Sequence, residues 1–337
     1  MALPGDEAEA IQRALRGRRV CVTGGAGFIG GHLSRALLET GCEVCIIDDL
    51  SASTGERLDE LFEIAGDALD FVHGSILDPG ALFDAVDGCH LVYHLAAMAS
   101  VTESMQHPQR SFDVNATGTL RVAEAARETR AARLIYAASS SAYGDAPTPH
   151  REHQAARPQS PYAAGKLAGE EIVQSWASSM GLDGVSLRFF NVFGPGQADD
   201  SPYAAVIPNF RRRLLAGEAP VIHGDGEQTR DFIAVTEVVR ALLLAGASSD
   251  ALRGETVNLG CGNAVTVNEL ARIMARLVGR EDLAPVHEGE RAGDVRHSVA
   301  DMAKAYAVLG FQARGDLESG LADLVMPTPG AGAATER

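Results

Sequence analysis

Tyr162 and Lys166 form the pair with the clearest chemical potential, in the segment YAAGK that follows Pro161. A spacing of four residues places both side chains on one face of a helix, one turn apart. A tyrosine that acts as a base near pH 7 needs its pKa lowered by about three units from ~10, or roughly 4 kcal/mol. A lysine ammonium at ~4 Å in an effective dielectric of ~20 supplies about that much. The pair therefore predicts a proton-transferring tyrosine; the alternative is a chance pair on the protein surface.

A run of hydroxyl groups, Ser139, Ser140 and Ser141, comes before this pair and directly after an apolar run over 133–137. That apolar run predicts a strand, and ligands in parallel sheets bind at the carboxyl ends of the strands. The serine hydroxyls could therefore hold a substrate oxygen near Tyr162.

A glycine-rich turn, with Gly24, Gly27 and Gly30, separates an apolar run over 18–23 from a helical pattern over 32–39. There the first glycine permits a tight turn, the second lets the backbone approach a pyrophosphate, and the helix N-terminus offers N–H groups to the anion. Asp48 ends the next strand, where an acidic residue binds ribose hydroxyls and repels a 2′-phosphate. The pattern predicts an NAD site; the alternative for Asp48 is a cap of the following helix.

The surrounding sequence predicts the elements that position these residues. Apolar runs alternate with helical patterns, and Asp78 before Pro79 is a typical helix start. The expected strands are 18–23, 43–48, 70–74, 90–95, 133–137 and 184–190, and the helices lie near 55–65, 78–86, 110–129 and 160–180. This alternation predicts parallel βαβ units, so we expect an α/β fold with a Rossmann-type doubly wound parallel sheet.

The pattern changes after Asn191, which predicts a smaller C-terminal α/β substrate-binding domain. We expect an NAD-binding Rossmann domain over 1–194, with segments near 231–260 returning to it, and a mainly substrate-binding domain over 195–326. Helices near 204–216, 236–247 and 267–278 and short strands at 221–223 and 255–259 are expected there. The composition of 327–337 is that of a disordered tail.

The overall charge limits the function classes. The chain has 337 residues, with 45 acidic residues against 29 Lys and Arg and a net charge of −16. This balance argues against nucleic-acid or membrane-surface binding, which needs clustered cations. No apolar run approaches the ~18–20 residues of a membrane span, and the acidic start lacks the pattern of a secretory signal. We therefore expect a cytoplasmic protein that binds neither nucleic acid nor membrane.

Cysteines and histidines offer two weaker candidate sites. Cys42 and Cys45 form a C-x-x-C without a second pair, so small apolar fillers are favoured over a zinc site. His150 and His153 lie in a Pro-rich segment without a third ligand nearby, so a solvated loop is favoured over a metal site. We expect reduced thiols and no metal.

Together the motifs resemble the extended short-chain dehydrogenase/reductase family, and within it the NAD-dependent nucleotide-sugar epimerases and dehydratases. The matching segments lie over roughly 18–310: GGAGFIG at 24–30, Asp48, HLAA at 94–97, Asn115, SSSAYG at 139–144, YAAGK at 162–166 and RFFN at 188–191. The resemblance implies that Tyr162 is the catalytic acid/base and that Lys166 orders it and the nicotinamide ribose. It also implies that a serine hydroxyl contacts the sugar 4-OH, Ser139 before its neighbours Ser140 and Ser141. The NAD contacts it implies are Gly24, Gly27, Phe28, Ile29, Gly30, Asp48, Ser75, Ile76, Leu95, Ala96, Ala97, Tyr162 and Lys166.

Three later segments are similar to bacterial UDP-N-acetylglucosamine 4-epimerases: PYAAVIP at 202–208, GDGEQTRDF at 224–232 and RAGDVRHS at 291–298. This likeness implies a UDP-sugar substrate. The implied contacts are Asn191, Arg230 and Arg291 on the UDP diphosphate, Asp294 on the nucleotide hydroxyls, and Ser100, Ser139, Val206 and Ser298 elsewhere. Without the likeness, Arg230 and Arg291 could be exposed arginines paired with Asp231 or Glu290. Helices near 110–129 and 160–180 resemble those of a homodimer interface in this family.

Two departures from the family refine the expected reaction. Ser75 stands where relatives often carry an aspartate that holds the adenine amino group, so a weaker adenine contact is expected. Ser140 and Ser141 stand where sugar 4,6-dehydratases carry an Asp-Glu pair, which disfavours dehydration.

The resemblance therefore implies reversible 4-epimerisation of UDP-N-acetylglucosamine and UDP-N-acetylgalactosamine, slower on UDP-glucose and UDP-galactose, through a 4-keto intermediate with tightly bound NAD. The alternatives are a UDP-hexuronate 4-epimerase or decarboxylase, and a catalytically silent NAD-dependent sensor or scaffold.

Overall fold

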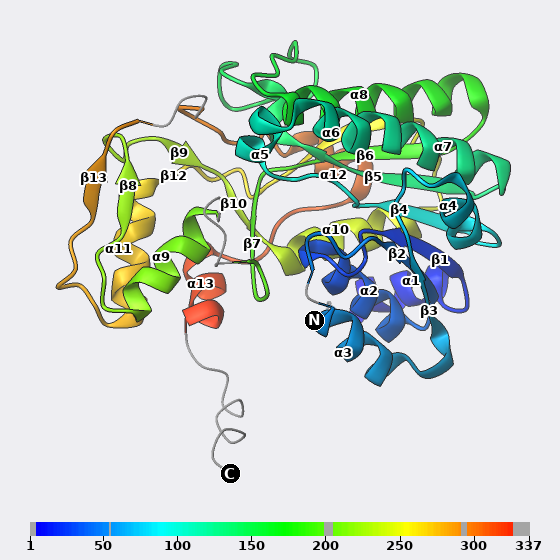
Figure 1. Ribbon diagram of the computed structural model, residues 1–337, viewed down its shortest axis with the longest axis horizontal. Helices are drawn as coiled ribbons and strands as arrows, with labels where there is room; N and C mark the ends of the chain where they lie inside the picture. Colours follow the sequence, from blue (N-terminus) through cyan, green and yellow to red (C-terminus); the bar gives the residue numbers. More distant parts are fainter. Residues whose placement is uncertain (1–4, 54, 199–204, 291–294, 326–337) are drawn as a thin grey trace.

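The computed structural model describes residues 5–53, 55–198, 205–290 and 295–325, and is built around one large parallel sheet (Figure 1). Seven strands follow the order β11-β6-β5-β4-β1-β2-β3. Their bounds are β1 (Arg19–Thr23), β2 (Glu43–Asp48), β3 (Leu69–His73), β4 (Leu91–His94), β5 (Arg133–Ser139), β6 (Asp183–Phe189) and β11 (Glu255–Leu259). The order reverses direction between β1 and β4, as in a doubly wound fold. The predicted α/β class and Rossmann-type parallel sheet are confirmed.

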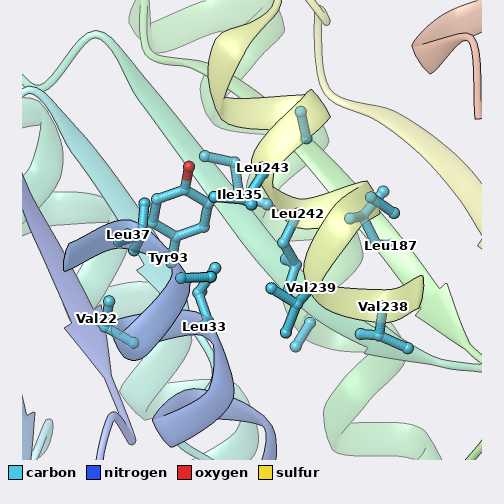
Figure 2. Close-up of a cluster of buried hydrophobic side chains, with 14 of the residues drawn as sticks. Val22, Leu33, Leu37, Tyr93, Ile135, Leu187, Val238, Val239, Leu242 and Leu243 are labelled. Carbon is cyan, nitrogen blue, oxygen red and sulfur yellow. The ribbon is translucent and has the colours of Figure 1, made fainter. Parts of the chain in front are cut away.

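Helices cover both faces of this sheet. One face carries α1 (Gly5–Leu15), α2 (Phe28–Thr40), α3 (Glu56–Ala65), α10 (Val235–Ala247) and α12 (Ala303–Leu309). The other face carries α4 (Pro79–Val86), α7 (Gly118–Glu128) and α8 (Pro161–Ser175). Figure 2 shows how the first face is filled: Leu33 and Leu37 of α2 approach Tyr93 of β4, while Leu242 and Leu243 of α10 pack beside them. The strands are buried on both sides, as in parallel sheets generally.

Helix starts follow the local sequence closely. The Asp78 carboxylate accepts hydrogen bonds from the Gly80 and Ala81 amides at 2.9 and 3.4 Å, and Pro79 begins α4. Helix α1 was not expected. It forms because Ile11 and Leu15 bury an apolar stripe at helical spacing against α10.

The single helix expected over 110–129 is confirmed, with a start two residues earlier and a π segment inside it. The chain forms α5 (Val101–Gln106), α6 (Pro108–Phe112), a π segment (Asp113–Thr117) and then α7. The π segment contains Asn115, whose side-chain amide donates to Met98 O at 3.1 Å while its oxygen accepts from Met98 N at 3.1 Å. Similarly, the helix expected to reach 180 continues from α8 as a π turn over Trp176–Met180.

Three two-stranded sheets and three helices form the smaller C-terminal part. The pairs are β7 (Asn191–Phe193) with β10 (Phe232–Ala234), β9 (Thr229–Arg230) with β12 (Val265–Thr266), and β8 (Val221–His223) with β13 (Val286–Glu288). Helices α9 (Val206–Leu215), α11 (Val267–Val278) and α13 (Leu317–Val325) enclose their own apolar core. The tail predicted over 327–337 lies outside the described residues. Within the described ranges, no helix is both long and apolar enough to cross a membrane.

Candidate active site

Several predicted cofactor contacts, and the predicted catalytic residue Ser139, lie at the carboxyl ends of neighbouring strands. Gly24 follows β1, Asp48 ends β2, Ser75 follows β3, Leu95 follows β4 and Ser139 ends β5. Because these strands are parallel, their carboxyl ends lie along one edge of the sheet, and the strand order reverses between β1 and β4, which is where doubly wound sheets bind ligands.

The glycine turn is packed so closely that side chains would not fit. Gly24 has φ +71°, and a Cβ placed on it would lie 2.8 Å from Ala96 backbone atoms. A Cβ on Gly30 would lie 2.0 Å from Gly24 O. Helix α2 begins immediately after Gly27, which offers no side-chain cap to the first amides. This bare helix start fits the diphosphate of a dinucleotide, because backbone N–H groups and the helix dipole favour an anion there.

Asp48 is held by the glycine turn itself. Its carboxylate accepts hydrogen bonds from Ala26 N at 3.0 Å and Leu50 N at 2.9 Å. Burial raises the pKa of Asp48, and these two amide bonds oppose that shift. Gly55 is the N-cap of α3, so the alternative role of Asp48 as a helix cap is wrong. The carboxylate retains lone pairs for ribose hydroxyls, which fits NAD at this position.

Asp48 leads to a prediction about cofactor choice. A 2′-phosphate ~4 Å from the carboxylate would be repelled by up to roughly 4 kcal/mol per charge at an effective dielectric of ~20. We expect the protein to bind NADPH at least ~100-fold more weakly than NADH, and Asp48→Asn to reduce that ratio to roughly 10. Fluorescence titrations with both nucleotides measure it. Equal affinity of the wild type for the two would contradict this role of Asp48.

Ser75 and Ile76, the residues predicted beside the adenine, directly follow the loop residue after β3. The Ser75 hydroxyl accepts from Leu77 N at 3.2 Å and so supports its own turn. Ile76 is buried against Gly118, where a Cβ would lie 2.5 Å from the Ile76 side chain. Ile76 therefore packs against the start of α7, and its contact with adenine stays a prediction.

A chain of hydrogen bonds holds the segment 95–97. It could not be foreseen from the sequence. The Thr119 hydroxyl donates to Asn115 O at 2.8 Å, so it must accept from His94 Nε2 at 3.0 Å. His94 Nδ1 then accepts from the Thr23 hydroxyl at 2.8 Å, and the Thr23 oxygen accepts from Ala96 N at 3.1 Å. Burial lowers the pKa of His94 to about 3, so the ring is neutral and its tautomer is set by these partners.

Lys166 is buried, with 3% of its surface exposed. Its Nζ donates to Ala137 O at 2.8 Å and lies 4.9 Å from the centre of the Tyr136 ring. Burial lowers the pKa of Lys166 to about 7, while Glu170, one turn further along α8, opposes the shift. The alternative of a chance surface pair is therefore wrong.

Tyr162 and Ser139 are brought together by the packing of α8 against β5. Burial raises the pKa of the Tyr162 phenol, and a hydrogen bond with Ser139 opposes that shift, so the expected lowering is not found among the protein's own groups. The Ser139 oxygen accepts from both the amide and the hydroxyl of Ser141, at 3.2 and 2.9 Å. The hydroxyl hydrogen of Ser139 is thereby left for the phenol or a substrate oxygen. Ser140, half-buried, begins the short helical turn that follows.

The predicted substrate residues lie where the smaller part joins the large sheet. Asn191 begins β7, and its N–H donates to Asp231 O at 2.9 Å. Arg230 lies on β9 and donates to Thr229 O at 2.8 Å. The N–H of Ser298 donates to the same Thr229 oxygen at 3.1 Å. Arg230 and Ser298 are therefore on neighbouring segments.

Asp231 anchors the junction between the smaller part and the large sheet. This role was not expected from the sequence. It is fully buried, and its carboxylate accepts from Cys261 N, Gly262 N and Ala300 N at 2.8, 2.9 and 3.0 Å. Burial raises its pKa and these amide bonds oppose the rise. Asp231 thus ties three backbone segments together, and its suggested role as an exposed salt-bridge partner of Arg230 is wrong. An acidic residue at the start of the apolar run FIA was the available signal.

The remaining predicted contacts are spread around this region. The Ser100 hydroxyl accepts from Glu103 N at 3.1 Å as the N-cap of α5, which leaves its hydrogen available. Val206 is the half-buried first residue of α9. Arg291 and Asp294 lie outside the described residues.

The candidate metal sites have other roles. Cys42 and Cys45 are buried and unpaired. His150 is also buried, stacked on Tyr143 with ring centres 4.5 Å apart, so the solvated loop expected there is wrong. The Tyr143 hydroxyl donates to Asn258 Oδ1 at 2.6 Å, which completes a packed cluster behind the serine turn. Among the described residues, no group of three or more His, Cys, Asp or Glu side chains could hold a metal ion.

Comparison with known proteins agrees with this geometry. Residues 20–260 match the NAD dependent epimerase/dehydratase family. A UDP-glucose 4-epimerase of Mycolicibacterium smegmatis is 38% identical over 91% of this chain and 97% of its own. The structure of a UDP-N-acetylglucosamine 4-epimerase from Methanobrevibacter ruminantium M1, in complex with UDP-N-acetylmuramic acid, superposes with a TM-score of 0.86 at 38% identity, covering 92% of this chain and 97% of that one. MoeE5, solved with UDP-glucuronic acid and NAD, gives 0.81 at 37% identity, covering 90% and 97%.

These matches span nearly the whole chain, and the bare helix start, the close glycine turn and Asp48 fit the cofactor that the family uses. The chain therefore belongs to the NAD dependent epimerase/dehydratase family, as an NAD-dependent UDP-sugar 4-epimerase family enzyme.

Proposed function

We propose that the protein interconverts UDP-N-acetylglucosamine and UDP-N-acetylgalactosamine, and acts more slowly on UDP-glucose and UDP-galactose. The observation that carries this proposal is the serine turn beside Tyr162. Ser139, Ser140 and Ser141 supply hydroxyls at the end of β5, and the turn supplies no carboxylic acid. Hydroxyls can orient a sugar oxygen, whereas elimination of water needs an acid to protonate the leaving hydroxyl. Proton transfer at one oxygen is therefore favoured over dehydration.

The roles of the chain's own groups follow from their positions. Ser139 donates its remaining hydrogen to the sugar 4-oxygen, and Tyr162 removes the proton from that oxygen and later returns it. Lys166 brings a positive charge beside the phenol and favours its ionised form. Gly24, Gly27, Gly30 and Asp48 would hold the cofactor, which supplies a reversible hydride acceptor when bound. Because the proton and the hydride are both returned, no net oxidation results.

Ser298 supports the choice of acetylated sugars. It is 8% exposed and lies beside the segment that carries Arg230. From the resemblance to bacterial UDP-N-acetylglucosamine 4-epimerases, we place Ser298 in the wall beside the sugar C2 substituent. A serine there leaves room for a 2-acetamido group, and an unfilled pocket costs a smaller sugar only its missing contacts.

A substitution tests this wall. We expect Ser298→Tyr to lower kcat/KM for the acetylated pair by ~10–100-fold, because overpacking costs ~1–3 kcal/mol, while the plain hexose pair is retained. Ser298→Ala is the matched control: it removes the hydroxyl without adding bulk and should stay close to wild type. Steady-state kinetics on all four sugars give the ratios. Equal losses for both pairs in Ser298→Tyr would place Ser298 away from C2.

The reaction itself is tested by incubating the purified protein and NAD with each of the four UDP-hexoses and with UDP-glucuronate, followed by NMR of the products. We expect 4-epimers, with NAD needed in less than molar equivalence to product. Faster conversion of UDP-glucuronate would favour a hexuronate 4-epimerase, and carbon dioxide release a decarboxylase. No turnover on any of them would favour a sensor or scaffold.

We also propose a homodimer. Three large apolar side chains are exposed on the adjoining helices α5 and α6: Val101 at 42%, Met105 at 61% and Phe112 at 47%. Exposed apolar side chains on adjoining helices are candidates for an association surface. Light scattering coupled to size exclusion measures the mass; a monomer at micromolar concentration would contradict the proposal.

A further inference from the structure

Arg57 of α3 joins two segments that are far apart in the sequence. Its Nη1 donates to Gly27 O at 2.6 Å, and its Nη2 donates to Gly196 O at 2.9 Å. His32, in the first turns of α2, adds a parallel contact by donating from Nε2 to Pro195 O at 2.9 Å. The loop after β7 thus binds the start of α2, toward which it extends in Figure 1. Hydrogen bonds from a charged guanidinium are stronger than those between neutral groups.

Two glycines make room for this one side chain. A Cβ on Gly31 would lie 1.8 Å from Arg57 Cδ. A Cβ on Gly196 would lie 2.2 Å from Arg57 Nη2, and Gly196 has φ +77°, which disfavours other residues. Both sides of the contact are therefore shaped around Arg57. Its neighbour Arg35 differs: it is exposed, with a longer 3.4 Å contact to Glu60.

The two joined segments lead to the two nucleotide sites. Gly27 is the N-cap of α2, whose first amides we assign to the cofactor diphosphate. The segment 194–197 continues from β7, which begins with Asn191, and runs on toward α9, which begins with Val206. We placed both Asn191 and Val206 at the UDP-sugar. A displacement of this segment would therefore be felt at both sites.

We propose that Arg57 is a positioning residue that couples the cofactor site to the substrate site, so that occupation of either strengthens binding at the other. The inference rests on the proposed function in taking UDP as the substrate's nucleotide. Both carbonyls must be held at once, which a planar guanidinium can do and a single ammonium cannot. Coupling of this kind is reciprocal, because it belongs to the equilibrium between the four binding states.

Binding measurements test the coupling without relying on turnover. The full-length protein, stripped of nucleotide, is titrated with NADH by fluorescence with and without saturating UDP, and with UDP by calorimetry with and without NADH. We expect each ligand to tighten the other about 10-fold in the wild type, within the usual range for coupled sites. In Arg57→Ala, we expect the factor by which one ligand tightens binding of the other to fall below about 2.

Further variants separate positioning from simple loss of structure. Arg57→Lys should keep one carbonyl contact and an intermediate factor. Gly31→Ala should displace the side chain while keeping its charge, and so should also lose the coupling. Arg35→Ala is the matched control and should keep the wild-type factor. Wild-type coupling in Arg57→Ala, or no coupling in the wild type, would overturn the inference.

The result of the epimerisation assay is independent of the result of the coupling measurement. An enzyme that epimerises without Arg57-dependent coupling contradicts this inference alone, and one that shows the coupling without epimerising contradicts the proposed reaction alone.

Discussion

Tyr162→Phe is expected to lower kcat by ~10²–10⁴-fold, the usual contribution of a general acid–base group. The ring keeps its place at the start of α8, and the oxygen that exchanges the proton is lost. Lys166 is held by Ala137 O, and Ser139 keeps its bonds with Ser141 although it loses the one with the phenol. The fold and the affinity for NADH should therefore be retained. Initial rates of epimerisation, melting temperature and NADH titration measure the three quantities.

The control for this variant is Tyr306→Phe, the same change at a tyrosine of α12 that is 65% exposed. It should leave the rate unaltered. If Tyr162→Phe epimerises at close to the wild-type rate, another group exchanges the proton, and the assignment of Tyr162 is wrong. A large loss of NADH binding in Tyr162→Phe would instead show that the hydroxyl acts mainly on the cofactor.

The scaffold of this site was predictable because its signals are local. The β1 apolar run, the glycine turn and the start of α2 are adjacent in sequence, and Asp78 with Pro79 marks α4 within four residues. Such signals act over one turn of helix or one strand, so a single window of sequence contains them.

Contacts between distant segments account for what was missed. Of the described two- and three-residue strands, β8 was expected and β7, β9, β10, β12 and β13 were missed, because so short a segment shows little periodicity and is fixed by pairing with a distant one. The π segment inside the helix over 108–128 was not foreseen; it holds Asn115, whose side chain bonds to Met98, 17 residues away. The burial of His150 depends on stacking against Tyr143, and Arg57 gains its role from Gly196. None of these partners is visible from the residue itself.

The electrostatics of the pair also needed the structure. Spacing alone suggested that Lys166 lowers the pKa of Tyr162, but Lys166 is buried and Tyr162 half-buried, and burial opposes the charged form of each. It raises the pKa of Tyr162 and lowers that of Lys166 to about 7. The site therefore contains a lysine whose charged form is disfavoured by its surroundings. This lysine lowers the stability of the fold but serves proton transfer.

Lys166→Met is accordingly expected to remove activity while making the fold more stable. Turnover should fall at least ~10²-fold, because the phenol loses its cationic neighbour, and the activity that remains should require a higher pH. For stability, the pKa of Lys166 is about 7 in the folded protein against an ordinary value of 10.5. Below pH 7 the folded state carries a buried ammonium at a cost. As the pH rises from 7 to 10.5, the folded chain releases a proton that the unfolded chain still binds, so the cost disappears.

Methionine fills a similar volume without the charge, although it leaves Ala137 O without the hydrogen bond it now accepts. The lost hydrogen bond offsets part of the gain by about 1–3 kcal/mol. We expect the nucleotide-free variant to melt about 2–4 °C above the wild type at pH 6, with the difference shrinking toward pH 9. Melting curves at pH 6 and pH 9 measure the stability difference, and a kcat–pH profile measures the remaining activity. Arg35→Met, which removes an exposed charge, is the control and should show no such pH dependence. A variant that melts well below the wild type at pH 6 would mean that the contacts of Lys166 with Ala137 and Tyr136 outweigh the burial of its charge.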